Sequence, residues 1–218
     1  MKIRILFAKF LIIIGRFIQS LAIMVMKPND LIEFSRQTYS RDKMVSGWSA
    51  DEIVNQGLRS EEQELIDKLP IKNGKLLLLG VGGGREAIPL ARMGFEITGL
   101  DFVAKMVDRA KENAAMQGLK IEGLVQEISS LNVPPNSYDI VWLSAAMYSC
   151  IPTNKKRIEM LHRIRKALKP NSFFICQFRM CPEKTTLKAA LLRRAFALLT
   201  FGNYRYEQGD MLWAGIEF

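Results

Sequence analysis

The apolar positions of this 218-residue chain fall into short blocks that alternate, over much of its length, with amphipathic stretches. Short uninterrupted apolar runs predict strands buried on both faces, and apolar residues spaced three or four apart predict helices. The expected strands are 76–79, 95–100, 121–125, 138–143 and 173–178. The expected helices are 86–93, 103–117, 154–168 and 186–201, and 211–218 reads as extended. Strands that alternate with such helices predict a parallel sheet with right-handed crossovers.

We therefore predict an α/β fold over residues 71–218, a doubly wound and mostly parallel sheet with helices on both faces. A helical segment over 28–70 would precede it as a cap or lid. Within that segment, Ser49 and Ser60 each stand before a helical pattern with acidic residues in its first turn, and both read as N-caps.

The first 26 residues form a mostly apolar helical pattern that basic residues interrupt. Lys2, Lys9 and Arg16 recur every seven residues, so a helix over 1–27 places them in one stripe opposite a large apolar face. This pattern favours an amphipathic helix in the membrane interface, with basic side chains at anionic headgroups. A transmembrane helix and a helix docked on its own domain or a dimer partner are the alternatives.

The net charge and the cysteine content indicate what the protein binds and where it is located. The net charge of +9 favours an anionic neighbour, either a membrane surface or a nucleic acid. Cys150, Cys176 and Cys181 form no paired spacing, which is typical of reduced thiols in a cytosolic protein. The only histidine is His162, so we predict no metal site. The expected location is cytoplasmic, peripheral to the inner face of a membrane.

Four glycines within residues 80–84 follow the first apolar run of the alternating region. Glycine lets a ligand approach the backbone closely and accepts positive φ angles. Gly80, Gly82 and Gly84 give the pattern G-x-G-x-G, whereas the dinucleotide fingerprint G-x-G-x-x-G would need its third glycine at Arg85. The turn is therefore predicted to bind a ligand other than a dinucleotide. Asp101 ends the second strand, where its carboxylate can accept ribose hydroxyls or cap the next helix.

From Lys75 to Phe178 the chain resembles the class I S-adenosylmethionine-dependent methyltransferases, and most of all the enzymes that methylate small molecules. The resemblance rests on four segments in order: LLLLGVGGG (76–84), ITGLD (97–101), VQEISSLNVPPNSYDIVWLS (125–144) and LHRIRKALKPNSFFICQF (161–178). It implies a Rossmann-like fold, S-adenosylmethionine as cofactor and in-line methyl transfer.

The resemblance also implies roles for individual residues. Gly80, Gly82 and Gly84 would lie under the methionine part of the cofactor, and Asp101 would hold the ribose. Phe102 would pack on the adenine, and Glu127 would accept from the adenine amino group with the Ile128 amide beside it. Leu143 and Ser144 would approach the sulfonium. Core packing is the alternative for Phe102 and Ile128, and a solvated loop acid is the alternative for Glu127. Tyr148 is the single candidate for orienting the acceptor, with a lid aromatic as its alternative.

Two departures from the family pattern stand out. Many relatives carry an acid two residues before the first glycine, where this chain has Leu78. The family sheet also ends in an antiparallel hairpin, of which residues 209–218 would supply one strand and nothing the other. The chain is therefore expected to be truncated, or to leave an edge for a partner.

The acceptor is the least constrained part of the prediction. The apolar start of the chain and a second apolar, basic helix at Leu187–Phe201 favour a lipophilic or membrane-associated small molecule, such as a quinone precursor or a phospholipid headgroup. An RNA methyltransferase that uses the basic helix 155–169 is the second hypothesis, although nucleic acid is the weaker candidate partner. A non-catalytic cofactor-binding subunit is the third.

Overall fold

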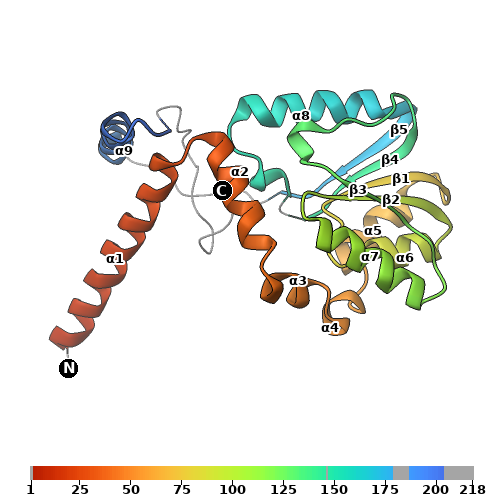
Figure 1. Ribbon diagram of the computed structural model, residues 1–218, viewed down its shortest axis with the longest axis horizontal. Helices are drawn as coiled ribbons and strands as arrows, with labels where there is room; N and C mark the ends of the chain where they lie inside the picture. Colours follow the sequence, from red (N-terminus) through yellow and green to blue (C-terminus); the bar gives the residue numbers. More distant parts are fainter. Residues whose placement is uncertain (1, 146, 179–186, 204–218) are drawn as a thin grey trace. The chain divides into compact units, whose positions relative to one another are not determined.

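The computed structural model describes residues 2–145, 147–178 and 187–203 (Figure 1). Of these, residues 2–35, 152–154 and 187–203 form one compact unit, and residues 36–145, 147–151 and 155–178 form a second. The strands are β1 (Gly74–Leu79), β2 (Phe95–Asp101), β3 (Glu122–Val125), β4 (Tyr138–Leu143) and β5 (Leu168–Cys176). The helices are α1 (Lys2–Val25), α2 (Pro28–Tyr39), α3 (Asp42–Trp48), α4 (Asp51–Val54), α5 (Ser60–Lys68), α6 (Ala87–Arg92), α7 (Ala104–Met116), α8 (Asn154–Ala167) and α9 (Leu187–Leu199). Two short 3-10 helices are η1 (Ile128–Ser130) and η2 (Met147–Cys150).

Among the described residues, the second unit is built on a five-stranded sheet whose paired strands are all parallel. Its order is β3-β2-β1-β4-β5, so the chain winds outward from β1 in one direction and from β4 in the other. The predicted doubly wound α/β fold is confirmed. Ligands of such sheets bind beyond the carboxyl ends of the strands, where the winding direction changes. This rule points to the ends of β1 and β4.

Each face of the sheet packs against its own helices (Figure 1). On one face Leu76, Leu78 and Trp142 pack in a cluster with side chains of α5, α6 and α7. On the other face Leu77 and Leu79 pack with side chains of α8. All four leucines of β1 are fully buried, which explains why this strand reads as a continuous apolar run and not as an alternating one.

The predicted element boundaries are close to the observed ones, but the two predicted serine caps are wrong. The residue before α4 is Ala50 and the residue before α5 is Arg59, and neither makes a side-chain capping bond. At α5 the bond runs the other way, because the backbone nitrogen of Arg59 donates to the Glu62 carboxylate at 2.8 Å. A glutamate in the first turn thus satisfies the helix start that we assigned to Ser60.

The described part of the first unit consists mainly of α1, the start of α2, and α9. Ile23 and Met24 at the end of α1 are buried in a small cluster with Leu31 of α2 and Ala197 of α9. The backbone nitrogen of Asn203 donates to the carbonyl of Met24 at 2.6 Å, which fixes the end of α1 to the segment after α9.

The helix predicted over 1–27 is present as α1, and its last turn packs against α2 and α9. Upstream of residue 20, the large apolar side chains of α1 that the structure describes are exposed. Lys9 is also exposed, whereas the side chains of Lys2 and Arg16 lie outside the described set. None of the described helices combines the length and hydropathy needed to cross a membrane. The predicted extended segment 211–218 lies outside the described residues, and the predicted three-part division of the chain stays a prediction.

Candidate active site

The carboxyl ends of the three central strands lie side by side in the second unit. Leu79 of β1 pairs with Leu100 of β2 and with Leu143 of β4. The residues that follow these strand ends therefore meet at one edge of the sheet, and they include the glycine turn, Asp101 and Ser144. The sequence placed its candidate residues at this same edge.

The glycine turn after β1 keeps a stretch of backbone open. Gly80, Gly82 and Gly84 all adopt positive φ, of 88°, 51° and 100°. A β-carbon placed on Gly82 would have no heavy atom within 4 Å, so the turn is uncovered at this position. At Gly83, by contrast, a β-carbon would collide with the Trp48 carbonyl oxygen and the Ser49 α-carbon, because the link between α3 and α4 packs directly on the turn. Glycine thus permits the positive φ angle at Gly82 and the close packing of the α3–α4 link at Gly83.

Gly80 has a different neighbour. A β-carbon at this position would lie 2.7 Å from the Met147 sulfur and 3.5 Å from the Ser144 β-carbon. Met147 belongs to η2, just beyond β4, so its unbranched side chain lies over the first glycine of the turn. Methionine has three rotatable side-chain bonds and adapts its shape readily.

Asp101 faces the glycine turn. One of its carboxylate oxygens accepts a hydrogen bond from the Gly82 nitrogen at 3.2 Å, and the other accepts from the Val103 nitrogen at 3.0 Å. The residue that precedes α7 is Val103, so Asp101 stabilises the approach to that helix without being its N-cap. Burial raises the pKa of this carboxyl above its ordinary value, against the opposing effect of the Val103 and Gly82 bonds. Each oxygen retains a lone pair for a further donor, as the predicted ribose contact requires.

Phe102 lies next to Asp101 in a small aromatic group. Its ring centroid is 6.5 Å from that of Tyr39, and the guanidinium carbon of Arg36 lies 6.0 Å from it. Val45, Val103 and Met106 form the buried cluster beneath. Phe102 is only partly buried, so its expected contact with adenine stays a prediction beside an observed packing role.

Glu127 and Ile128 follow β3. Glu127 precedes η1 and accepts from the Ser129 backbone nitrogen at 2.9 Å and from the Ser129 hydroxyl at 2.6 Å. Ile128 is buried in the cluster on the α8 side of the sheet. The carboxylate of Glu127 is therefore held in place by its own turn, and its expected bond to an adenine amino group stays a prediction.

Leu143 and Ser144 end β4 at the switch point of the sheet. Leu143 is fully buried, and the expected approach of Leu143 and Ser144 to the sulfonium stays a prediction. The Ser144 nitrogen donates to the Leu79 carbonyl at 3.0 Å, and the Ser144 hydroxyl donates to Glu86 at 2.5 Å. Ser144 therefore connects β1, β4 and the residue before α6.

Tyr148 lies in η2, within an aromatic contact. Its ring centroid is 5.8 Å from that of Phe178, and the guanidinium carbon of Arg157 is 5.8 Å from the Tyr148 ring centroid. This arrangement agrees with the lid-aromatic alternative as well as with acceptor orientation, and the catalytic role stays a prediction.

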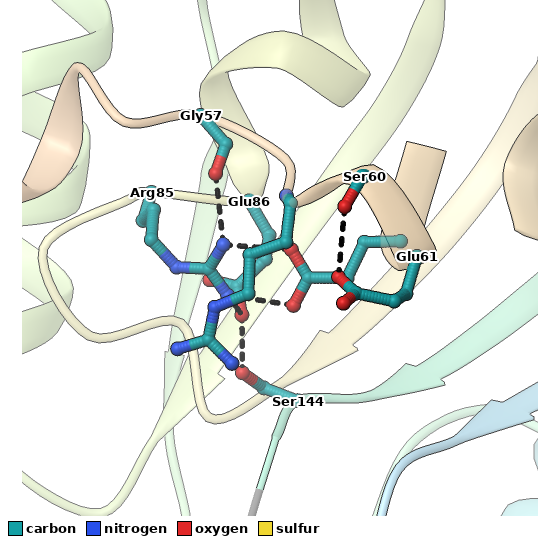
Figure 2. A network of polar contacts seen from close by, with 8 residues as sticks. Gly57, Ser60, Glu61, Arg85, Glu86 and Ser144 are labelled. Carbon is teal, nitrogen blue, oxygen red and sulfur yellow. Dashed lines mark hydrogen bonds and ion pairs between the residues drawn. The ribbon is translucent and has the colours of Figure 1, made fainter. Parts of the chain in front are cut away.

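Sequence reasoning missed a buried network of charges behind the turn (Figure 2). Arg85 donates to both oxygens of Glu62, at 2.7 and 2.8 Å, and to Glu86 at 2.5 Å. Burial raises the pKa of Glu86 above its ordinary value, against the charge of Arg85, whereas the bonds from Arg85 hold the pKa of Glu62 below its own despite burial. The available signal was the pair Arg85–Glu86, two charged residues placed directly after the glycines and before an apolar helix.

Comparisons with known proteins agree with this geometry. The sequence model of a family described as "Methyltransferase domain" matches residues 76–171, from β1 into β5. Residues 76–171, which lie almost entirely in the second unit, are therefore a methyltransferase domain of the class I S-adenosylmethionine-dependent type. Its cofactor is S-adenosylmethionine.

Two relatives and one solved structure illustrate the similarity. The ubiquinone biosynthesis O-methyltransferase of Cereibacter sphaeroides is 28% identical over 127 residues, which are 58% of this chain and 49% of that protein. An uncharacterised methyltransferase of Synechocystis sp. is 30% identical over 118 residues, which are 51% of this chain and 53% of that protein. The chain thus spans about half the length of the curated relatives it matches. Phosphoethanolamine N-methyltransferase 1 of Haemonchus contortus shares the fold, with a TM-score of 0.56 at 19% identity over 72% of this chain and 33% of its own.

The residues at the sheet edge fit the cofactor. The uncovered backbone at Gly82 admits a close ligand, and the Asp101 carboxylate beside it matches a pair of ribose hydroxyls. When bound, the cofactor supplies an activated methyl group, and the protein has to bind it, orient it and exclude water. The glycine turn and Asp101 are the groups that we predict to bind it, and Met147 of η2 lies against the first glycine of that turn.

Proposed function

We propose that the protein transfers the methyl group of S-adenosylmethionine to a lipophilic small molecule at a membrane surface. The observation that carries the proposal is the exposed apolar surface of α1. Its large apolar side chains from Ile3 to Ile18 that the structure describes have between 37% and 82% of their surface exposed. A contiguous apolar surface of this kind marks an interaction site and not an ordinary water-facing helix.

Basic residues accompany this surface, which favours an anionic membrane. Arg4 and Lys9 are exposed on α1, and Lys188 and Arg194 are exposed on α9. On α9 they stand among exposed leucines, namely Leu191, Leu192, Leu198 and Leu199. Apolar side chains that enter the headgroup boundary and basic ones that reach anionic headgroups are the two components of interfacial binding. A location peripheral to the cytoplasmic face of a membrane follows from this part of the proposal.

The acceptor class rests on the relatives together with the membrane surface. Several relatives, including that of Cereibacter sphaeroides, are named ubiquinone biosynthesis O-methyltransferases. We extend this to a lipophilic acceptor whose hydroxyl oxygen attacks the methyl carbon. The new O–CH3 bond then replaces the S–CH3 bond, S-adenosylhomocysteine leaves, and the hydroxyl proton passes to a base. Tyr148, beside the end of β4, is the residue we propose to orient this acceptor.

Membrane attachment is tested on the full-length chain by flotation with vesicles that contain phosphatidylglycerol. The test variant carries Phe7→Glu and Leu11→Glu, two exposed positions of α1. We expect wild type to float with the vesicles and the variant to remain in solution. Met116→Glu is the matched control, because Met116 is an exposed apolar residue of α7 in the methyltransferase domain. Equal flotation of all three proteins would refute the membrane role of α1.

Catalysis is tested by incubating the protein with radiolabelled S-adenosylmethionine and a membrane lipid extract, followed by chromatography of the organic phase. The proposal expects label in a lipophilic product. Label that appears in added RNA and not in the lipid fraction would support the alternative of an RNA methyltransferase. Cofactor binding without any labelled product would support a non-catalytic subunit.

The RNA alternative rests on the basic helix α8, and several of its cations already have partners. Arg157 donates to the Ile151 carbonyl at 2.9 Å, Arg163 donates to the Leu131 carbonyl at 3.1 Å, and Lys155 lies 4.0 Å from Glu159. A surface that contacts phosphates would require these groups to exchange partners, and its affinity would fall steeply with added salt. We therefore favour the membrane acceptor.

A further inference from the structure

The buried network behind the glycine turn contains two carboxylates and a single guanidinium. Arg85, Glu62 and Glu86 are all largely removed from water, with side-chain exposures of 10%, 0% and 5%. Their formal charges leave one uncompensated negative charge when both acids are ionised. An uncompensated buried charge is costly, and burial accordingly raises the pKa of the Glu86 carboxyl, so its ionised form calls for a further positive charge nearby.

The Glu62–Arg85 pair is already complete. It is bidentate, the Arg85 guanidinium also donates to the Gly57 carbonyl at 2.8 Å, and Glu62 also accepts from the Arg59 nitrogen. This pair links α5 to the turn before α6 without help from Glu86. Glu86 is therefore the acid whose charge the protein does not need for that link.

Glu86 is also the acid nearer to the cofactor site. Its carboxylate accepts the hydrogen bond from Ser144, as Figure 2 shows, and Ser144 follows the last residue of β4. The Ser144 β-carbon in turn lies 3.5 Å from the position that a β-carbon on Gly80 would occupy. Ser144 thus bonds Glu86 through its hydroxyl and lies close to Gly80 through its β-carbon.

We propose that Glu86 is the counter-charge for the cationic methionine end of the cofactor, which carries a sulfonium and an ammonium group. Arg85 and Ser144 hold the Glu86 carboxylate in place, and the cofactor supplies the positive charge that the buried network lacks. This proposal rests on the cofactor of the domain and is independent of the acceptor. A purely structural role, in which Glu86 only ties α6 to β4, makes different predictions for stability.

The experiment is calorimetric titration of the full-length protein with three ligands. S-adenosylmethionine carries both cationic groups, S-adenosylhomocysteine carries the ammonium alone, and methylthioadenosine carries neither. In Glu86→Gln we expect S-adenosylmethionine to bind at least about tenfold more weakly, because a charge-assisted contact is lost. The affinity for methylthioadenosine should stay unchanged. If S-adenosylhomocysteine loses as much affinity as S-adenosylmethionine, Glu86 contacts the ammonium group. If it loses less affinity, Glu86 contacts the sulfonium.

Unchanged binding of S-adenosylmethionine, or an equal loss for methylthioadenosine, would overturn the proposal. Glu86→Asp, which keeps the charge, should recover part of the lost affinity. Thermal unfolding of each variant separates an effect on binding from an effect on folding. If the role of Glu86 is only structural, Glu86→Gln should unfold at a lower temperature and lose the same affinity for all three ligands. The matched control is Asp139→Asn, since Asp139 accepts from the Lys75 nitrogen near the opposite end of β1. A wild-type protein that binds but methylates no lipid would contradict the proposed function and leave this inference intact.

Discussion

Two stretches of four consecutive aliphatic residues have opposite surroundings in this protein. Residues 76–79, four leucines in β1, are all 0% exposed. Residues 11–14, a leucine and three isoleucines in α1, are 37% to 65% exposed. A parallel sheet covered by helices on both sides buries an apolar strand completely, whereas a helix that packs through its last turn leaves most of its surface uncovered. The methyltransferase domain thus covers residues 76–79 completely, whereas the described residues leave 11–14 exposed, and the partner that we propose for α1 is a membrane surface.

The largest expected effect comes from matched truncations in these two stretches. Leu77→Ala should lower the free energy of unfolding by about 3 kcal/mol, because it removes buried methyl groups and leaves a cavity. Ile13→Ala should change that free energy by less than about 0.5 kcal/mol, since its side chain is mostly exposed. Urea denaturation of both variants measures the difference. Comparable losses would mean that α1 is buried in solution.

The next effect concerns cofactor binding by the domain. Asp101→Ala should weaken S-adenosylmethionine by at least about tenfold, because it removes the acceptor predicted for the ribose hydroxyls. The change also removes the bonds to Gly82 and Val103, so thermal unfolding of the variant has to be measured beside the titration. Phe7→Glu, in α1, is the control and should bind the cofactor as wild type does. An unaltered affinity in Asp101→Ala would contradict the assignment of the ribose contact.

Acidification should weaken cofactor binding through the same carboxyl. Because burial raises the pKa of Asp101, this group takes up its proton at a higher pH than a solvated aspartate, and affinity is lost as the pH falls through that raised pKa. The effect of Asp101 on folding depends on pH in the opposite direction. The folded protein binds the Asp101 proton more tightly than the unfolded chain does, so this proton stabilises the fold at low pH, and the stabilisation is lost as the pH rises through the raised pKa. Asp101→Asn should show no such step. Titrations of wild type and Asp101→Asn at matched pH values isolate the contribution of this residue.

The smallest effect is expected near the amino-terminal end of the sheet. Although partial burial opposes ionisation, the bonds from Lys169 and from the Lys75 nitrogen hold the pKa of Asp139 below its ordinary value. Asp139→Asn should therefore cost less than about 1 kcal/mol of stability at neutral pH, since the ion pair is partly exposed. That cost should disappear as the pH falls through the lowered pKa. Denaturation at neutral and acidic pH measures it, and a cost that persists in acid would point to packing against Gly74 instead of charge.

Sequence reasoning located most strands and helices closely, but it misplaced the start of β5 and two helix caps. β4 was predicted with its observed bounds, and β1 and β2 within two residues, because buried parallel strands are continuous apolar runs. β5 begins at Leu168, five residues before its predicted start, because Pro170 and Asn171 read as a turn although the strand includes them. The caps at Ser49 and Ser60 were wrong for different reasons. The link between α3 and α4 packs on Gly83, which is distant in sequence, whereas the Glu62 carboxylate that bonds the Arg59 nitrogen is a local partner that the prediction did not use.

The sequence alone determined that this chain forms a parallel α/β sheet with an open turn after its first strand, because the order of its apolar and glycine-rich segments predicts both. A local pattern is enough for these two features, because a run of apolar residues predicts a buried strand and glycines accept the positive φ angles of the turn. Only the tertiary structure decided that Glu62, from a helix over 20 residues upstream of Arg85, completes the pairing of that arginine and leaves Glu86 facing Ser144. Pairing of buried charges depends on which segments the fold brings together, and the periodicity of a sequence carries no information about that.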